Sequence, residues 1–184
     1  MSQFNQDNLQ NQTQREDAYV QLAHQTIKEY VRTGKVINVP GNLPQEMHDG
    51  RAGVFVSIKK NGSLRGCIGT IQAVQTSIAE EIIHNAVCAS SEDPRFAPIT
   101  PDELSQLTIS VDVLGEMETI ASPLELDVKR YGVVVTKGYK RGLLLPNLDG
   151  VDTIAEQIAI AKQKAGIGIM EEAQLQRFEV VRHY

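Results

Sequence analysis

The chain has 184 residues, of which 41% are hydrophobic and 5% aromatic, and its formal net charge is −5 at pH 7. This size predicts one large domain or two small subdomains that share a core. The acidic balance argues against a general nucleic-acid binder, and no apolar run approaches the roughly 18 residues of a membrane span. With two cysteines and no signal pattern, the sequence predicts a cytoplasmic protein in a reducing compartment.

The first part of the chain is predicted to hold a tail and a helix. Residues 1–14 are rich in Asn and Gln and nearly free of apolar side chains, which predicts a disordered tail. Apolar residues then recur at helical spacing from about Arg15 to Thr33, and Gly34 is placed to cap this helix. A loop follows, with a short strand expected at Val36–Val39.

A β-hairpin is predicted over Gly53–Thr70, where two apolar runs flank Asn61-Gly62. This dipeptide tolerates positive φ at both positions of a two-residue turn, so it is the strongest local signal for a hairpin. Counting outwards from the turn pairs Val56 with Cys67. Because side chains alternate along a strand, Arg65 and Cys67 are expected on one face.

Two glycines interrupt the second strand of this hairpin. Gly66 and Gly69 each weaken a strand, and glycine within a strand often marks a place where another backbone or a ligand comes close. We therefore expect a partner segment or a ligand to approach here, and Thr70, directly after Gly69, joins the candidate binding residues.

The rest of the chain lacks the regular βαβ rhythm of a doubly wound sheet. Ser77 and Glu80 predict a capping box for a helix that ends near Ser90–Ser91. Five further strands and one further helix are expected at Leu107–Leu114, Glu118–Ala121, Tyr131–Thr136, Leu143–Leu145, Gln176–Arg182 and, for the helix, about Asp152 to Ala165. About three main helices and six to eight strands predict an α+β fold with mostly antiparallel sheets.

Cys67 is the first candidate for chemistry. A thiolate is the reactive form of cysteine, and a neighbouring cation such as Arg65 favours that form. The functional interpretation is an activated thiol that acts as a nucleophile or responds to redox state. The structural interpretation is a small, half-buried strand residue, because free cysteine is among the most buried residue types. The sequence leaves both interpretations open.

Arg65 also has two interpretations. Its forked donors suit a carboxylate or a phosphate, which either a ligand or the protein itself supplies. Asp93 and Asp112 are the acidic residues expected to pair with it inside the protein.

The segment Asp93-Pro94-Arg95-Phe96 combines an acid, a rigid turn, a base and an aromatic ring. Turn chemistry alone explains Asp93 and Pro94. Arg95 and Phe96 then either anchor the loop or face a ligand.

Other polar clusters favour structural roles. The basic loop 137–142 lacks the arrangement of a phosphate-binding loop and is interpreted as a solvated turn. His84 and Cys88 share a helix face and are interpreted as a packed or partly exposed pair. The four histidines show no metal-ligand spacing, so no metal and no cofactor is predicted.

Four motifs occur in order along the chain: Leu64-Arg65-Gly66-Cys67-Ile68-Gly69-Thr70, Asp93-Pro94-Arg95-Phe96, Arg141-Gly142-Leu143-Leu144-Leu145-Pro146 and Lys164-Ala165-Gly166. Together they resemble the AMME-syndrome candidate protein family, from about Arg15 to the C-terminus, and the first motif is a specific signature. The sequence departs from the family pattern at Ala97, where a proline is expected, and at 128–131, where Gly-Lys-His is more usual.

The resemblance implies an α+β domain over residues 15–184, built of two unequal, interleaved subdomains around a cleft. It also implies genomic or covalent association with a Memo-like protein and a radical S-adenosylmethionine protein, the other components of the AmmeMemoRadiSam system. It implies no established reaction.

Two functional hypotheses follow. In the first, which we favour narrowly, the chain is a non-catalytic adaptor for those two partners. In the second, it is a small-molecule enzyme or binding protein with Cys67 as the nucleophile or acceptor thiol. Its cleft is then lined by Arg65, which binds an anion, by Asp93 as base or orienting group, and by Thr70 and Arg95. Nucleic acid is the least favoured partner.

Overall fold

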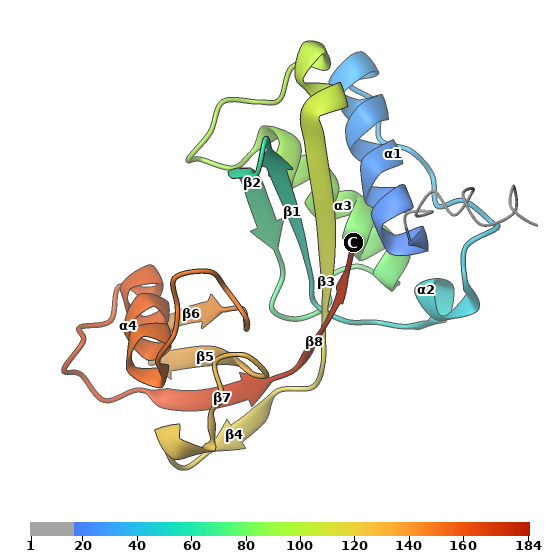
Figure 1. The fold of residues 1–184 in the computed structure, drawn as a ribbon. Coiled ribbons are helices and arrows are strands. Elements are labelled where there is room, and N and C mark those ends of the chain that lie inside the picture. The colour runs from blue at the N-terminus through green and yellow to red at the C-terminus, as the bar shows by residue number, and fades with distance from the viewer. Residues whose placement is uncertain (1–16) are drawn as a thin grey trace, which may run out of the picture.

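The computed structural model describes residues 17–184, so the tail predicted at residues 1–14 lies outside the described residues. The helices are α1 (Ala18–Thr33), α2 (Gln45–Asp49), α3 (Ile78–Ser91) and α4 (Ile154–Ala165), with short 3-10 helices η1 (Pro101–Gln106) and η2 (Pro123–Glu125). The strands are β1 (Val54–Lys60), β2 (Ser63–Gly69), β3 (Leu107–Leu114), β4 (Glu118–Ile120), β5 (Gly132–Lys137), β6 (Lys140–Leu144), β7 (Gln174–Phe178) and β8 (Val180–His183). Two four-stranded antiparallel sheets and three main helices confirm the predicted α+β fold (Figure 1).

The first sheet, sheet A, has the strand order β2-β1-β3-β8 and carries α1 and α3 on one face (Figure 1). Its central strand β1 alternates strictly, with Val54, Val56 and Ile58 fully buried against the helices. The residues between them, Phe55 and Ser57, point to the opposite face. We call this second face the open face of sheet A.

The second sheet, sheet B, has the order β4-β7-β5-β6 and is covered by α4. Val133 and Val135 of β5 and Ala161 of α4 form the centre of its core and are completely buried. Gly142 of β6 allows α4 to lie close, because a Cβ at that position would collide with the Ala161 carbonyl oxygen.

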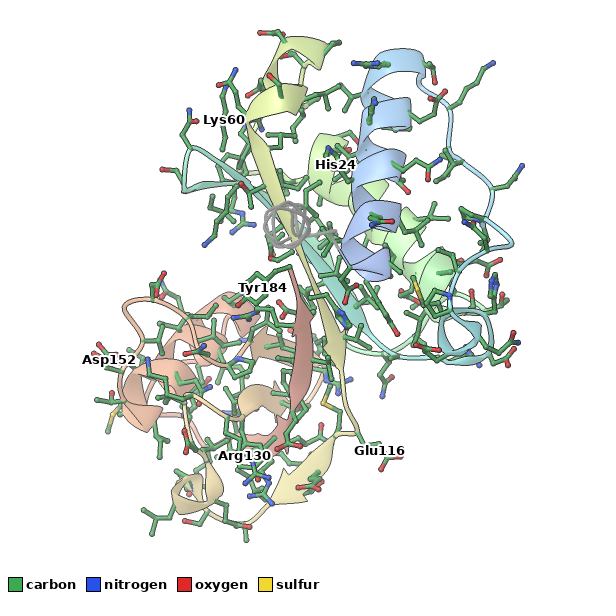
Figure 2. The ribbon with its side chains drawn as sticks, turned by 45° about the vertical axis from the view of Figure 1, so that its right-hand side comes forward. His24, Lys60, Glu116, Arg130, Asp152 and Tyr184 are labelled. Atoms are coloured by element: carbon green, nitrogen blue, oxygen red, sulfur yellow. The ribbon has the colours of Figure 1, made fainter. Side chains whose placement is uncertain are left out.

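Two neighbouring segments connect the sheets. The chain leaves β3 of sheet A through Gly115 and returns through Glu179, which precedes β8, and the Gly115 amide donates to the Glu179 carbonyl at 2.8 Å. Figure 2 shows Glu116 on this connection, with Lys60 on the sheet A side and Arg130 on the sheet B side. The assignment of the two sheets to two subdomains with a cleft stays a prediction.

Side chains from both sheets form a shared apolar cluster. Leu114 at the end of β3 and Phe178 at the end of β7 are buried in it, together with Val134 and Leu143 of sheet B and with Leu145, which follows β6. Half-buried Phe55 packs on the same cluster from the open face of sheet A. Sheet B therefore covers the part of the open face at which Phe55 lies.

The hairpin turn is as predicted, but the register is not. Asn61 and Gly62 adopt φ of 50° and 81°, as a two-residue turn of this type requires. A bulge then shifts the pairing, so that Ser57, and not Val56, faces Cys67. One extra residue in a strand moves the following side chains to the other face. Cys67 consequently lies on the open face.

Three smaller predictions are wrong. Val36–Val39 is not a strand, since no described strand pairs with it. The final predicted strand is divided into β7 and β8, which belong to different sheets, because Glu179 lies at the connection. The capping box of α3 is half formed: the Ser77 hydroxyl accepts from the Glu80 amide, but the Glu80 carboxylate accepts from Thr76.

Candidate functional site

Cys67 lies in a row of thiol and hydroxyl groups on the open face of sheet A. It pairs with Ser57 of β1, which in turn pairs with Ser110 of β3. The Cys67 Sγ and the Ser57 Oγ are 3.3 Å apart, within hydrogen-bonding distance for sulfur. The thiol is half-buried and forms no disulfide.

Asp93 and Arg95 cover the free edge of β2 at Cys67. The Cys67 amide donates to the Asp93 Oδ2 at 2.9 Å, and the Arg95 Nη2 donates to the Cys67 carbonyl at 3.1 Å. This pair of side chains occupies the two groups that a further strand would bind, which blocks edge-to-edge pairing. The structure thus brings the first two predicted motifs together.

Asp93 is fully engaged by donors. Its carboxylate accepts from the Arg95 Nε at 2.9 Å, from the Arg95 Nη2 at 2.7 Å and from the Arg95 amide, besides the Cys67 amide. The bonds from Arg95 are the main reason that the pKa of Asp93 falls to about 2. A carboxylate with so low a pKa orients its neighbours and is a poor proton acceptor near neutral pH. The geometry fits the orienting role rather than the base.

Arg95 keeps part of its guanidinium free. Its side chain is 55% exposed and lies over the half-buried Phe96 ring, 5.5 Å from the centroid. Nε and Nη2 are bonded to Asp93 and Cys67, whereas Nη1 has no hydrogen-bond acceptor among residues 17–184. Free guanidinium donors are suited to a carboxylate or a phosphate.

Lys164 adds a second cation from the other sheet. It lies in the last turn of α4, close enough to Cys67 and Arg95 for their charges to interact. Loss of hydration, and to a smaller extent the positive charge of Arg95, lower the pKa of Lys164, although the residue is exposed at the surface. In the part of the chain that the structure describes, no carboxylate pairs with it. Sequence reasoning missed this residue as a site, though its motif was recognised.

Arg65 pairs with a residue that sequence reasoning did not predict. Its Nε and Nη2 donate to the two oxygens of Glu103 at 3.0 and 2.9 Å, and its Nη1 donates to the Ala97 carbonyl at 2.8 Å. The expected partners are wrong because Asp93 binds Arg95 and Asp112 binds Arg182. Glu103 also accepts from Lys60 at 2.9 Å, so Arg65 belongs to a closed internal network.

The space beside each of the two glycines of β2 is filled by residues of the same chain. A Cβ at Gly66 would overlap the Ala89 carbonyl oxygen of α3, and a Cβ at Gly69 would overlap the Phe55 ring. The approaching backbone is therefore helix α3 of the same chain, not an external segment. Thr70 is likewise committed: its hydroxyl donates to the Glu81 Oε1 at 2.6 Å, deep beside α3.

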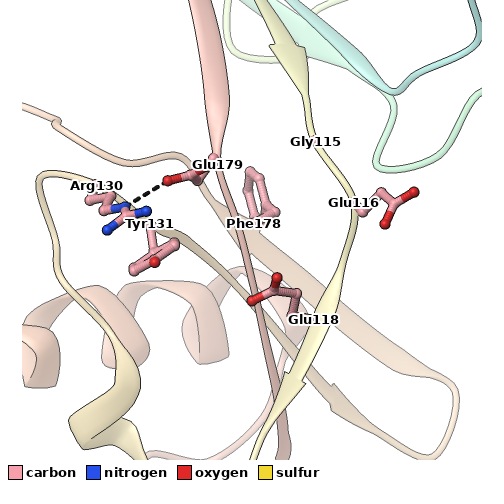
Figure 3. A pocket seen from close by; sticks show the side chains of 7 residues that line it. All are labelled: Gly115, Glu116, Glu118, Arg130, Tyr131, Phe178 and Glu179. Carbon is pink, nitrogen blue, oxygen red and sulfur yellow. Dashed lines mark hydrogen bonds and ion pairs between the residues drawn. The ribbon is translucent and has the colours of Figure 1, made fainter.

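A pocket of about 270 Å³ lies at the connection between the sheets (Figure 3). Its charged groups are largely paired, with Arg130 2.6 Å from Glu179 and the Arg130 guanidinium over the Tyr131 ring. Two further grooves lie beside α4 and beside α3. None of these three cavities is lined by Cys67, so they do not include the predicted cleft.

Cys88, the second cysteine, differs from Cys67. Its thiol is 3.9 Å from the His84 Nε2, and burial, followed by the charge of Glu92, raises its pKa to about 11. Such a thiol is almost entirely protonated near neutral pH and is unreactive.

Neither a metal centre nor a membrane helix is found in residues 17–184. No three His, Cys, Asp or Glu side chains converge there as a set of metal ligands. No helix in this range has the length and apolar content that a membrane span requires.

Known proteins resemble the whole described chain. The Thermotoga maritima protein is 48% identical over 170 residues, which cover 91% of this chain and 98% of the relative. Protein CA_C1420 of Clostridium acetobutylicum is 48% identical over 184 residues, all of this chain but only 39% of the relative. The chain thus spans about two-fifths of the length of that relative.

A solved structure supports the same relationship. The crystal structure of the uncharacterized protein PH0010 from Pyrococcus horikoshii superposes with a TM-score of 0.82 at 32% sequence identity, covering 89% of this chain and 88% of the other. The AMMECR1 family model matches residues 20–183. These matches confirm the resemblance that the four motifs indicated, and the chain belongs to the AMMECR1 family.

Proposed function

We propose that this chain is a thiol-dependent enzyme or binding protein for a small molecule, with Cys67 as its reactive group. One observation carries the proposal: Cys67 lies on the open face of sheet A, Arg95 of the loop after α3 donates to its carbonyl at 3.1 Å, and the charge of Lys164 in α4 interacts with the thiol. Cations close to a cysteine stabilise the thiolate, which is the nucleophilic form.

Each neighbour has a role in this proposal. The Ser57 hydroxyl, 3.3 Å from Sγ, donates to the thiolate. Arg95 and Lys164 supply positive charge, and Asp93 fixes the Arg95 fork against the edge of β2. A cytoplasmic location belongs to the same proposal, because the thiol must stay reduced.

The test is the rate at which iodoacetamide alkylates the native protein between pH 6 and 10, followed by intact mass and peptide mapping. Cys88 is an internal reference, since the raised pKa of its thiol keeps it protonated over most of this range. We expect one fast adduct, at Cys67, in the wild type and in Cys88→Ser, and none in Cys67→Ser at pH 7.

Two results would contradict the proposal. If Cys67 reacts no faster than free cysteine and titrates near the ordinary value of about 8.5, the reactive-thiol proposal is wrong. A Cys67→Ser variant that retains every ligand interaction of the wild type leads to the same conclusion.

A second candidate function is an adaptor that acts with a Memo-like protein and a radical S-adenosylmethionine protein. The observation in its favour is the Clostridium acetobutylicum relative, in which the matching region makes up 39% of a longer protein. Gly66 and Gly69 no longer support it, since their spaces are occupied by Ala89 and Phe55.

Co-purification with the two partners from the same source tests the adaptor function. An adaptor without thiol chemistry associates equally well as wild type and as Cys67→Ser. Absence of association in both oxidised and reduced buffers would count against this function.

A further inference from the structure

We propose that the groove between residues 36–39 and α3 is a docking site for an extended peptide segment of another protein. The bound segment lies alongside residues 36–39 as a strand and presents a basic side chain to Glu80. The groove is on the helix side of sheet A, whereas Cys67 lies on the open face, so the inference does not depend on the thiol chemistry.

The groove is the largest of the three cavities described above. Its volume is about 570 Å³, which is within the size range of ligand sites. The stretch 36–39 lines it together with Gln75 and Thr76. The remaining lining is a stripe of α3 at helical spacing, formed by Glu80, Ile83, His84 and Val87.

The stretch that borders the groove has the side-chain pattern of a strand. Ile37 and Val39 pack on the core of sheet A, while Val36 and Asn38 are exposed, as in a half-buried strand. Its β-branched side chains favour an extended backbone, and Pro40 restricts the residue before it to that conformation. The stretch is therefore extended, although no described strand pairs with it.

The main chain of this stretch is available for pairing. Within residues 17–184, no amide or carbonyl group of residues 36–39 forms a hydrogen bond with another main-chain group. Such groups bond strongly, and in a sheet the neighbouring strand satisfies them. The anchored side chains of Ile37 and Val39 hold them in place before binding, which lowers the entropy lost on binding. An extended peptide is the ligand that fits this arrangement, because its main chain supplies the matching donors and acceptors.

A comparable edge elsewhere in the protein is protected. At the free edge of β2, Asp93 and Arg95 bind the amide and the carbonyl of Cys67. Proteins cover strand edges in this way because exposed edges pair with other chains. The stretch 36–39 has no such cover among the described residues, so it is left accessible beside the groove.

Glu80 determines the charge of the ligand. Its Oε2 accepts from the amide and the hydroxyl of Thr76, whereas its Oε1 has no donor within residues 17–184. The residue is half-buried, so its carboxylate has lost part of its hydration. No described lysine or arginine lines the groove, and the formal net charge of the chain is −5. A lysine or arginine of the ligand complements this carboxylate.

The apolar side chains of α3 select the other positions of the peptide. Ile83 and Val87 lie one turn apart in the lining. A strand beside residues 36–39 directs every second side chain to the same face. We therefore expect apolar residues at alternate positions of the ligand, with a lysine or arginine at the position that meets Glu80. The four residues 36–39 span roughly 13 Å, which is enough to pair with about four residues of the peptide.

The test is selection of a phage-displayed library of random decapeptides on the purified protein. Val36→Arg is the groove variant: its side chain is 55% exposed, so the substitution spares the core and places a cation where the basic ligand binds. Val181→Arg, at a position on β8 that is 62% exposed, is the matched control. We expect the enriched peptides to bind the wild type and Val181→Arg equally, and Val36→Arg roughly tenfold more weakly or less.

Two measurements with an enriched synthetic peptide test the main-chain pairing. Amide hydrogen exchange at residues 36–39 should slow when the peptide is bound. Alternate amides of the peptide are then N-methylated in two complementary sets, which preserve the side chains and remove the donors on one edge at a time. The set that faces residues 36–39 should abolish binding, and the other set should retain it.

Substitution of Glu80 tests the basic position. Glu80→Gln should weaken binding of the peptide roughly fivefold, as the removal of one nearby charge implies. It should not affect a peptide in which methionine replaces the basic residue. Glu172→Gln, at an exposed position outside the groove, should leave the affinity for both peptides unchanged. Circular dichroism spectra confirm that each variant is folded.

The contrary outcomes are equally specific. Absence of enriched peptides, or peptides that bind the wild type and Val36→Arg equally, overturns the docking site. Binding that survives both N-methylated sets overturns the pairing with residues 36–39. A dimer of the protein that forms in analytical ultracentrifugation and that Val36→Arg dissociates assigns the groove to a second copy of this chain instead of another protein.

Discussion

At the turn end of β2, the Arg65 guanidinium is surrounded by acceptors of its own chain, whereas at Cys67 the Arg95 guanidinium keeps a donor free. Both arginines pair with a buried carboxylate, Glu103 in one case and Asp93 in the other. The difference lies in the guanidinium nitrogens that lack an acceptor within residues 17–184 after this pairing: Arg65 has none, whereas Arg95 has Nη1. The signature sequence therefore has two parts: the part at Arg65 serves the structure, and the part at Cys67 is available for chemistry. We call them the structural half and the chemical half, and the predictions below test this division.

The largest effect is expected at Gly66, in the structural half. Gly66→Ala places a Cβ against the Ala89 carbonyl oxygen, and since backbone cannot rotate away, α3 must shift. We expect a loss of about 3 kcal/mol in the free energy of unfolding, measured by urea denaturation. Gly41→Ala is the control, because nothing lies within 4 Å of its Cβ. Equal stability of the two variants would contradict the packing described for α3.

Glu103→Gln should give the next largest effect. It leaves Arg65, whose side chain is 16% exposed, without its carboxylate, and it also removes the partner of Lys60. We expect a loss of roughly 2 kcal/mol at pH 7, with the alkylation rate of Cys67 unchanged. Glu172→Gln, an exposed position without a partner in the described residues, is the matched control. A large change in Cys67 reactivity would show that the two halves are coupled.

Asp93→Asn tests the other half, with a smaller loss of about 1.5 kcal/mol at pH 7. The native pKa of Asp93 is about 2, below its unfolded value of roughly 4. Its stabilisation is therefore fully present above about pH 4 and is lost as the pH falls towards 2.

The difference in stability between wild type and Asp93→Asn should accordingly shrink between pH 4 and pH 2. Thermal unfolding across this range measures it. Asp93→Asn should also accelerate alkylation at Cys67, because the positive charge of Arg95 is no longer neutralised. A constant stability difference down to pH 2 would contradict the ion pair.

Lys164→Met should have the smallest effect on stability, within about 0.5 kcal/mol, because no ion pair is broken. Urea denaturation of this variant beside Lys28→Met gives the comparison. A loss above 2 kcal/mol would indicate a structural partner for Lys164 and would remove it from the chemical half.

Local patterns predicted much of the fold. The Asn61-Gly62 turn, the helix that ends at Thr33 and the strand Leu107–Leu114 depend on local turn chemistry and on periodicity, and all three are confirmed. The predicted strand Gln176–Arg182 failed because the break at Glu179 depends on a contact with Gly115, which is distant in the sequence.

The candidate site depends even more strongly on contacts between residues that are distant in the sequence. The bulge beside Ile58 is associated with Arg65, whose partners Ala97 and Glu103 lie more than thirty residues away. No sequence pattern within the hairpin predicts this bulge, yet the bulge determines the face of sheet A on which Cys67 lies. The position of Lys164 relative to Cys67 depends on the packing of the two sheets, so local sequence patterns could not predict it either.

The connection through Gly115 and Glu179 has a consequence for the order of folding. Three strands of sheet A precede the whole of sheet B in the chain, and its fourth strand, β8, follows sheet B. A nascent chain therefore emerges with sheet A incomplete and with the edge of β3 unpaired until β8 has left the ribosome. Formation of sheet B brings β8 next to β3 and shortens the loop that must close. Sheet B thus acts during synthesis as the element that delivers the last strand of its neighbour.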